Sequence, residues 1–284
     1  MTDPAQALLI ALAILALGAA LFWPERGLAV RWFARLRKTD RVLLEDALKH
    51  LYDDEYNERE ANLNGLAGAM GVPRNRIAAL IEQLERMGLV TSASGALRLT
   101  AEGRTNALRV VRIHRLWERY LADHSGLEEL EWHPRAEKLE HTTTSEQAEA
   151  MARRMGQPRF DPHGDPIPTA AGEIAPQRGQ ALNTLGVGDH GMVTHVEDEP
   201  AAVYAQLVAA GIRPGTQVRV LQVSSESMRI ALDGDEHLFA PVVAGNVSVV
   251  KRSEPAEELV AADPLSDLKP GEVATVVNLS LIHI

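Results

Sequence analysis

The sequence predicts a mainly α-helical protein whose C-terminal part is a small β-barrel. Between residues 40 and 175, apolar residues recur at three- and four-residue spacing, as they do along the buried face of a helix. After residue 181, short runs alternate between apolar and polar residues and are bounded by Gly and Pro, which is typical of strands. Hydrophobic residues make up 45% of the 284 residues, enough for several cores. Cysteine is absent, which excludes disulfide frameworks and thiolate metal sites.

The first segment, residues 1–24, has the composition of a transmembrane helix. From Ala7 to Trp23 the chain reads ALLIALAILALGAALFW, a run without charge that just reaches the length needed to cross a bilayer. Residues 25–39 form a basic juxtamembrane linker, and this charge asymmetry places the rest of the chain on the cytoplasmic side. We therefore expect a single-pass protein at the cytoplasmic face of the inner (plasma) membrane. A cleaved signal peptide and a buried core helix are the alternatives.

Residues 40–105 have the order of elements of a winged helix-turn-helix. A helix with Asp40 as its N-cap comes first, and a short second helix spans residues 63–70. A Gly-Val-Pro turn then leads into a third helix from Arg74 to Met87, which Gly88 ends. Residues 90–99, with Ser-Gly at the tip, predict a β-hairpin. In such a unit the second helix of the helix-turn-helix pair enters the major groove of DNA.

Four side chains are candidates for DNA contact: Arg74, Asn75, Arg76 and Arg98. The first three begin the third helix, and Arg98 lies in the hairpin. Taken singly, each arginine is more typical of a solvated surface, and it is the cluster at the start of a recognition helix that favours DNA contact. The formal net charge of −10 does not exclude DNA, because the acidic residues are concentrated in the C-terminal half. Residues 24–120 hold 17 Lys and Arg against 13 Asp and Glu, and residues 121–284 hold 12 against 25.

A set of carboxylates and imidazoles predicts a metal centre. Its members are Asp46, His114, Glu118, His133, Glu137, Glu140 and His141. A long helix from Thr100 to about residue 123 carries the first His–Glu pair at i and i+4, on one face. A second helix, beginning near His133, carries Glu137, Glu140 and His141 at i, i+3 and i+4. Oxygen and nitrogen ligands without sulfur suit Mn²⁺, Fe²⁺ or Co²⁺. A surface ion pair is the alternative for either helical pair alone.

Six strings carry a family resemblance across residues 40–175. They are EDALKHLY (45–52), LERMGLV (84–90), LTAEGR (99–104), RIHRLWERYL (112–121), HPRAEKLEH (133–141) and DPHGDPIP (161–168). With them the chain resembles the iron- and manganese-dependent repressors of the diphtheria-toxin-repressor family. The resemblance implies a winged helix-turn-helix DNA-binding domain over 40–105 and a metal-binding and dimerisation domain over 106–175. It further implies a homodimer on a pseudo-palindromic operator in double-stranded DNA, with a divalent metal as corepressor.

Carried over by position, the resemblance divides the ligands between two sites. The primary site would hold Asp46, Glu137, Glu140 and His141, and the ancillary site His114, Glu118 and His133. Iron-type members have Met and Cys at the places of Asp46 and Glu137, so the carboxylates here favour Mn²⁺ modestly over Fe²⁺. Lys49 stands where the manganese-type branch has a second acidic ligand, a departure that argues against the paired manganese site of that branch.

The C-terminal half resembles FeoA-like domains with an SH3-like barrel. We expect strands at 191–196, 218–223, 228–232 and 247–250, and a short helix from Ala201 to Ala210, in a domain over 182–252 of five or six strands. The barrel could take part in metal binding, or it could equally be a packing or protein-contact module. Residues 264–284 repeat its opening and predict the truncated start of a second such domain. The final LSLIHI resembles the translation of a sequencing adapter, so we expect an artificial end.

Two functions follow from these features. The main prediction is a metal-dependent transcriptional repressor of iron or manganese homeostasis, tethered to the membrane by its N-terminal helix. The alternative is a membrane-associated accessory of ferrous or manganous ion transport, which would act through the FeoA-like domain. An enzyme is not expected, because the sequence has no nucleophile or oxyanion motif beside the predicted ligands.

Overall fold

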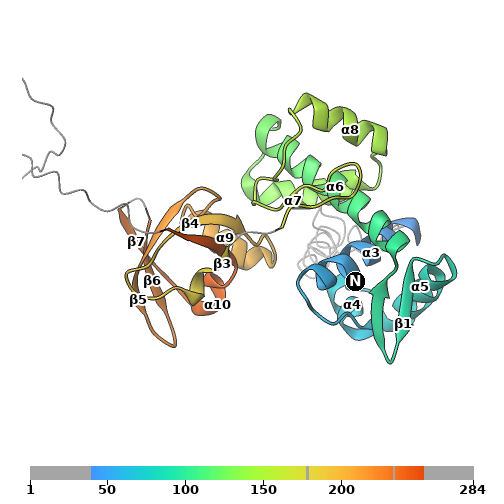
Figure 1. Cartoon of the computed structure of the whole chain (residues 1–284), viewed down its shortest axis with the longest axis horizontal. Helices are drawn as coiled ribbons and strands as arrows, with labels where there is room; N and C mark the ends of the chain where they lie inside the picture. The colour runs from blue at the N-terminus through green and yellow to red at the C-terminus, as the bar shows by residue number, and fades with distance from the viewer. Residues whose placement is uncertain (1–39, 177–178, 233, 253–284) are drawn as a thin grey trace, which may run out of the picture. The chain divides into compact units, whose positions relative to one another are not determined.

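The computed structural model describes residues 40–176, 179–232 and 234–252. The chain divides into two compact units, one up to residue 177 and one from residue 178 onward. The first is helical with one β-hairpin, and the second is built on a β-sheet (Figure 1). The predicted anchor (1–24), basic linker (25–39) and second FeoA-like start (264–284) lie outside the described residues.

The first unit follows the order predicted for a winged helix-turn-helix. Its elements are α3 (Asp40–Tyr56), α4 (Leu63–Met70), α5 (Arg74–Arg86), β1 (Val90–Ala93), β2 (Ala96–Leu99), α6 (Ala101–His124), α7 (Glu129–Glu140) and α8 (Ser145–Arg154). Their buried apolar residues form two cores. The larger joins α3, α4, α5, the hairpin and the first half of α6, and the smaller lies between the middle of α6 and α8.

Local capping explains where α4 and α6 begin and end. The Asn62 side chain accepts hydrogen bonds from the backbone N–H groups of Asn64 and Gly65, at 3.1 and 3.0 Å, and so starts α4. Gly71 ends α4 with φ of 61°, a left-handed conformation that glycine adopts without steric cost. The Thr100 hydroxyl accepts from the Gly103 N–H at 3.0 Å and starts α6. These caps fix the turn before α5 and the direction in which α6 leaves the hairpin.

The hairpin and α5 present one buried and one exposed side. Strands β1 and β2 pair antiparallel, with Val90 opposite Leu99 and Thr91 opposite Arg98. Leu97 and Leu99 are buried while Arg98 between them is exposed, as the alternation of side chains along a strand requires. On α5, Ile77 and Leu84 are buried completely and the N-terminal turn is exposed. The DNA-contact candidates are therefore accessible on both elements.

Helix α7 begins earlier than the sequence indicated. It starts at Glu129, so His133 lies in its second turn instead of at its beginning, and His141 is its C-cap residue. A capping box explains the early start: Glu128 accepts from the N3 backbone, and the Glu131 side chain accepts from the Glu128 N–H at 3.3 Å. The shift places His133 far enough inside the helix for its side chain to face α6.

The second unit is a six-stranded antiparallel sheet in the order β3-β8-β4-β5-β6-β7. Its elements are β3 (Gln180–Ala181), η1 (Leu182–Thr184), β4 (His190–Val196), α9 (Ala201–Ala209), β5 (Gln217–Val223), β6 (Met228–Leu232), β7 (Asp235–Phe239), α10 (Pro241–Ala244) and β8 (Val247–Arg252). Residues from η1, the strands, α9 and α10 share one core. Strand β7 was not predicted, because DEHLF has the polar composition of a loop. It forms by pairing with β6, where Leu232 lies opposite Asp235.

Across the described ranges, no helix combines the length and the apolar composition that a membrane span requires.

Candidate metal centre

Two groups of possible metal ligands lie where α3, α6 and α7 meet. The first consists of His114 and Glu118 on α6 and His133 on α7. His114 Nε2 lies 2.9 Å from Glu118 Oε1 and 3.3 Å from His133 Nδ1, and the latter lies 3.1 Å from the same carboxylate oxygen. Burial would raise the pKa of Glu118, but the charge on His114 and hydrogen bonds from three histidines hold that pKa well below its usual range. The carboxylate is therefore ionised and ready to bind a cation.

The second group consists of Asp46 on α3, Glu140 at the end of α7 and His141 just after it. His141 Nε2 lies 3.1 Å from Asp46 Oδ1 and 3.5 Å from Glu140 Oε1. Burial lowers the pKa of His141, yet hydrogen bonds to Asp46 and Glu45 outweigh it and raise that pKa to about 9. A cation in this group would replace the proton of His141, because a histidine ligand must be neutral.

Glu140 joins the two groups. Its side chain is fully buried, and its Oε2 lies 2.5 Å from His114 Nδ1. When His114 is neutral, an Nδ1–H that donates to Glu140 leaves the lone pair on Nε2, which faces Glu118 and His133. A hydrogen-bonded carboxylate of this kind fixes the tautomer and orientation of a ligating imidazole.

Lys49, one turn after Asp46 on α3, also lies in the centre. Its Nζ is 3.3 and 3.4 Å from the two carboxylate oxygens of Glu140 and 3.4 Å from His114 Nδ1. Burial lowers the pKa of Lys49, but Glu140 and three further carboxylates outweigh it and leave that pKa raised. The side chain is therefore an ammonium cation among the predicted ligands.

Glu45 is a residue of the centre that the sequence analysis did not single out. Its Oε2 accepts from His141 Nδ1 at 2.8 Å, which turns Nε2 of the ring toward Asp46. Burial would raise the pKa of Glu45, but His141, Arg109 and Arg41 outweigh it and lower that pKa. A charged residue on the buried side of α3, next to Asp46, was the signal in the sequence.

The segment with the sequence DPHGDPIP brings a third histidine to Glu118. Arg115 on α6 donates to Pro166 O at 2.8 Å and to Asp165 at 3.1 Å, which holds the segment against the helix. His163 Nδ1 then lies 3.8 Å from Glu118 Oε2, with the imidazole buried. In the same turn, burial and the charges of Asp165 and Glu118 raise the pKa of Asp161 to about 8. The segment carries part of the family resemblance, but none of its residues was predicted to lie in the metal centre.

Glu137 is the one predicted ligand that lies outside both groups. Its side chain is 52% exposed, and its nearest described ionic partner is His133 Nε2, at 3.8 Å. Glu140 is fully buried one turn later, so the i and i+3 positions of α7 do not face the centre equally. The other six predicted ligands, Asp46, His114, Glu118, His133, Glu140 and His141, are brought together as two sets of three.

The donor chemistry of both groups fits a divalent transition metal. Each offers three ligand atoms within 4.8 Å of one another, one set with two imidazoles and a carboxylate and the other with two carboxylates and an imidazole. Nitrogen and oxygen donors without sulfur suit Mn²⁺, Fe²⁺ and similar ions. Outer residues orient the ligands, as Glu45 does for His141.

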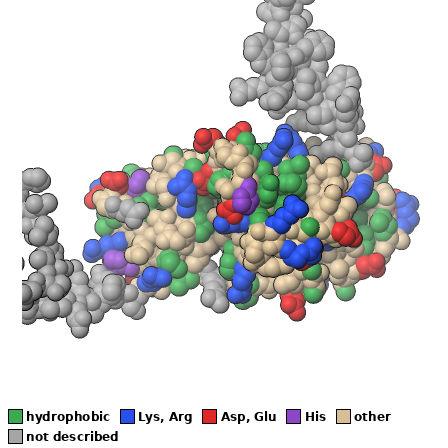
Figure 2. All heavy atoms as spheres, turned by 90° about the horizontal axis from the view of Figure 1, so that it is seen from above, with side chains coloured by type: hydrophobic (Ala, Val, Ile, Leu, Met, Phe, Trp, Pro, Cys, Tyr) green, Lys and Arg blue, Asp and Glu red, His purple; other side chains and the backbone are tan. Residues whose placement is uncertain are grey.

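The DNA-contact candidates lie on the exposed side of the helix-turn-helix elements. Arg74 donates to Asn64 on α4 at 2.9 Å, and Arg76 forms an ion pair with Asp40. Asn75 and Arg98 are exposed. Such solvent-exposed pairs contribute at most about 1 kcal/mol, so they can be exchanged for phosphate contacts at little cost. On the face shown in Figure 2, basic and acidic side chains are interspersed.

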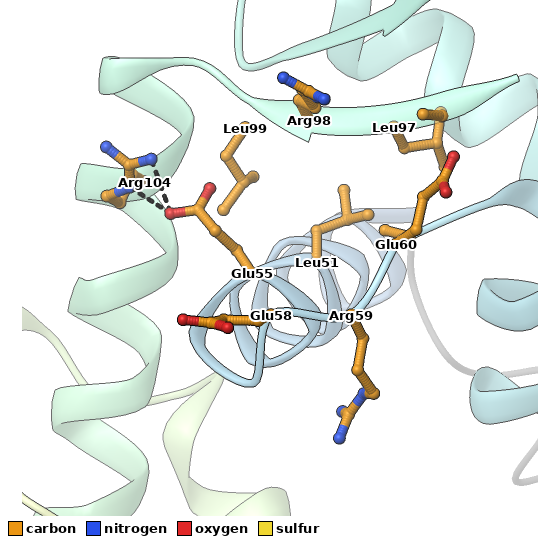
Figure 3. A pocket seen from close by; sticks show the side chains of 11 residues that line it. Leu51, Glu55, Glu58, Arg59, Glu60, Leu97, Arg98, Leu99 and Arg104 are labelled. Carbon is orange, nitrogen blue, oxygen red and sulfur yellow. Dashed lines mark hydrogen bonds and ion pairs between the residues drawn. The ribbon is translucent and has the colours of Figure 1, made fainter. Parts of the chain in front are cut away.

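A pocket of about 720 Å³ lies beside the hairpin (Figure 3). The end of α3, the 58–61 segment, β2 and the start of α6 enclose it, and Arg98 is on its rim. Its lining mixes both charges, and Arg104 holds Glu55 at 2.6 Å. The three-ligand groups found among the described residues lie elsewhere.

These features define a class: a helical unit with helix-turn-helix elements and two divalent-metal ligand groups, joined to a β-sheet unit. One protein family matches part of the helical unit, and another matches the β-sheet unit. The family described as "Iron dependent repressor, metal binding and dimerisation domain" matches residues 100–169, and the FeoA domain matches residues 180–251. The chain belongs to the diphtheria toxin repressor family of iron- and manganese-dependent regulators.

Relatives of known name carry this assignment. The diphtheria toxin repressor of Corynebacterium efficiens is 32% identical over 156 residues, which are 51% of this chain and 68% of that protein. The iron-dependent repressor IdeR of Mycobacterium tuberculosis is 28% identical over 179 residues, covering 58% and 77%. A Chlamydia trachomatis protein named "Probable metal transport system membrane protein" is 31% identical over 144 residues, but this chain spans only 29% of its length.

Solved structures agree with the fold. A manganese-dependent transcriptional repressor in complex with manganese has a TM-score of 0.69 and 30% identity, and the match covers 74% of this chain and all of that one. ScaR with bound Zn²⁺ has a TM-score of 0.65 and 25% identity, with 73% and 98% covered.

These comparisons correct the predicted localisation. The prediction of a single-pass protein at the cytoplasmic face of the inner membrane is wrong, because relatives that match over most of their own length are named as repressors. The described residues also supply no membrane-spanning helix in its support.

Proposed function

We propose that this chain is a metal-dependent transcriptional repressor with Mn²⁺ or Fe²⁺ as its corepressor. It acts as a homodimer on a pseudo-palindromic operator in double-stranded DNA. The names of its relatives support a repressor of iron or manganese metabolism and a non-enzymatic role. The proposed ligands are Asp46, Glu140 and His141 in one site and His114, Glu118 and His133 in the other, with Glu137 as a further primary-site ligand.

One observation carries the proposal: the ligand groups connect the helix-turn-helix unit to the helices that follow it. Asp46 lies on α3, whose buried face packs in the core that also holds α4 and α5. Glu140 and His141 lie at the end of α7, and His114 and Glu118 on α6. A bound divalent ion would supply the positive charge that brings these carboxylates together. Asp46 and Glu140 then fix the position of α3 relative to α7, which positions α5 for DNA.

The finer domain assignment belongs to the same proposal. Residues 40–105 form the winged DNA-binding domain, 106–175 the metal-binding and dimerisation domain and 182–252 an SH3-like FeoA domain. Arg74, Asn75, Arg76 and Arg98 contact the operator. The exposed N-terminal turn of α5 and the exposed position of Arg98 support this role.

The test is metal-dependent DNA binding by the full 284-residue chain. An operator selected from random duplexes in the presence of Mn²⁺ is titrated with and without a chelator. We expect the chelator to weaken binding at least about 100-fold, within the range of strong allosteric couplings. The double variant Arg74→Ala/Arg76→Ala should lose DNA affinity and keep its Mn²⁺ affinity. Equal DNA binding under chelator would contradict the proposal.

The transport accessory proposed as the alternative has weaker support. The relative named as a metal transport protein is matched over 29% of its length, whereas the repressors are matched over 57% to 77%.

A further inference from the structure

Lys49 places a positive charge where the two ligand groups adjoin. Its ammonium contacts both oxygens of Glu140, at 3.3 and 3.4 Å, and lies 3.4 Å from His114 Nδ1. Glu140 belongs to one group, and His114 to the other. The Lys49 side chain is only 18% exposed, so little water screens its charge.

Lys49 contacts both oxygens of Glu140, but the other groups around the two oxygens differ. Oε1 also faces His141 Nε2, at 3.5 Å, whereas Oε2 faces His114 Nδ1, at 2.5 Å, and that nitrogen itself lies 3.4 Å from the ammonium. Asp46 Oδ1 lies on that same side, 3.1 Å from His141 Nε2. An ion held by Asp46, Glu140 and His141 therefore fits beside Oε1. A further ion beside Oε2 would have to lie next to the ammonium.

An ammonium and a divalent cation exclude each other at such a position. A protonated lysine has three donors and no lone pair, so Lys49 cannot ligate an ion. Its charge repels a second cation strongly at contact distance in a partly buried site. From this arrangement we propose that Lys49 is a fixed cation of the centre that takes the place of a further metal ion beside Glu140 and limits the Asp46–Glu140–His141 group to one ion. This inference rests on the proposed metal-binding function.

The test is the number of Mn²⁺ ions bound by the full chain, measured by equilibrium dialysis and elemental analysis. Lys49→Glu removes the cation and adds a carboxylate at the same place, so it should bind about one Mn²⁺ more per chain than the unaltered protein. Lys49→Leu removes the cation without adding a ligand. It should bind no extra ion but should bind Mn²⁺ at least about tenfold more tightly, since the loss of one charge on the order of 5 Å from a divalent ion has that effect even at the dielectric constant of water.

Two further variants separate this role from a structural one. Lys49→Arg should keep the ion count of the unaltered chain. Lys138→Glu makes the same charge change on the exposed side of α7 and should alter neither count nor affinity.

The outcomes are distinguishable. If the unaltered chain binds Mn²⁺ and Lys49→Glu binds the same number of ions, the inference is overturned and the proposed function stands. If the unaltered chain binds no Mn²⁺ or Fe²⁺, the proposed function fails, and the inference with it. Should Lys49→Glu fail to fold, as judged by circular dichroism, unchanged affinity in Lys49→Leu would overturn the inference.

Discussion

Glu140 is the carboxylate that connects the two ligand groups. Its carboxylate contacts Lys49, His114 and His141, and its side chain is fully buried. Burial would raise the pKa of Glu140, but the hydrogen bond from His114 and the charge of Lys49 outweigh it and lower that pKa. Both groups would depend on this anion, because it would ligate the ion in one and it orients His114 in the other.

Removing that charge should therefore weaken metal binding strongly. We expect Glu140→Gln to lower Mn²⁺ affinity by about 100-fold or more, since altering even an outer-shell partner costs 10- to 100-fold. Glu131→Gln is the matched control on the same helix, because it removes the same charge from an exposed side chain outside both groups and Gln can keep its capping contact. This change should cost less than about threefold. Isothermal titration with Mn²⁺ measures both, and equal losses would contradict the special role of Glu140.

His141 predicts a pH dependence of the metal-free chain. Its pKa is about 9 in the folded protein and 6.5 ordinarily, so the folded state binds this proton more tightly. The resulting stability is complete below pH 6.5 and is lost as the pH rises through 9. The loss is at most about 3 kcal/mol.

Urea unfolding in chelator at pH 6, 7.5 and 9.5 measures this dependence. His141→Gln cannot titrate there and should show a flatter profile than the unaltered chain, although it keeps Glu45 and Asp46. Profiles of equal slope would mean that His141 is not held by these two carboxylates.

At the scale of elements, the start of α6 lies against the backbone that precedes the hairpin. A Cβ atom on Gly103 would lie 1.9 Å from the carbonyl oxygen of Leu89, a distance that no packing allows. The Thr100 hydroxyl donates to Gly88 O at 2.7 Å across the same contact. This approach sets the direction of the helix that carries His114 and Glu118.

Gly103→Ala should therefore destabilise the fold by about 2–3 kcal/mol, as overpacking of a tight contact does. Gly68→Ala is the control, because nothing lies within 4 Å of its added Cβ and alanine favours the interior of a helix. It should leave stability unchanged or raise it by up to about 1 kcal/mol. Thermal unfolding of the two variants checks this, and similar melting temperatures would rule out the close contact.

The helices of the first unit could be predicted because spacing and caps agree. Gly88, with φ of 72°, follows the end of α5 and Thr100 starts α6, as predicted, and the apolar stripes lie where the cores are. The start of α7 was not predicted, because the acidic residues before His133 show no apolar periodicity. A capping box of Glu128 and Glu131 sets this start instead. Strand β7 was missed because its stability comes from pairing with β6, which its own composition does not show.

The site was less predictable than the fold. Spacing places His114 and Glu118 on one face, but it does not show that Glu140 faces inward while Glu137 is half exposed. The role of Glu45 depends on its contact with a histidine 96 positions later. In the sequence, Lys49 is only a departure from a family pattern. Its position beside Glu140 is a tertiary contact between residues 91 positions apart, which the sequence does not show.

At the scale of the whole molecule, we expect metal binding and DNA binding to affect each other. The ligands come from three helices, and one of these, α3, shares its core with the helices proposed to read DNA. If the metal-bound arrangement of α3 and α7 is the one that fits an operator, each ligand must increase the affinity for the other by the same factor. The FeoA-matching unit has its own core and supplies none of the ligands of these two groups.

The most direct test is therefore a Mn²⁺ titration of the full chain with and without saturating operator DNA. We expect the operator to tighten Mn²⁺ binding on the order of 100-fold. Mn²⁺ should tighten operator binding by the same factor. An operator duplex with a scrambled sequence should leave the Mn²⁺ affinity unchanged. Identical Mn²⁺ affinities with and without the true operator would contradict the account.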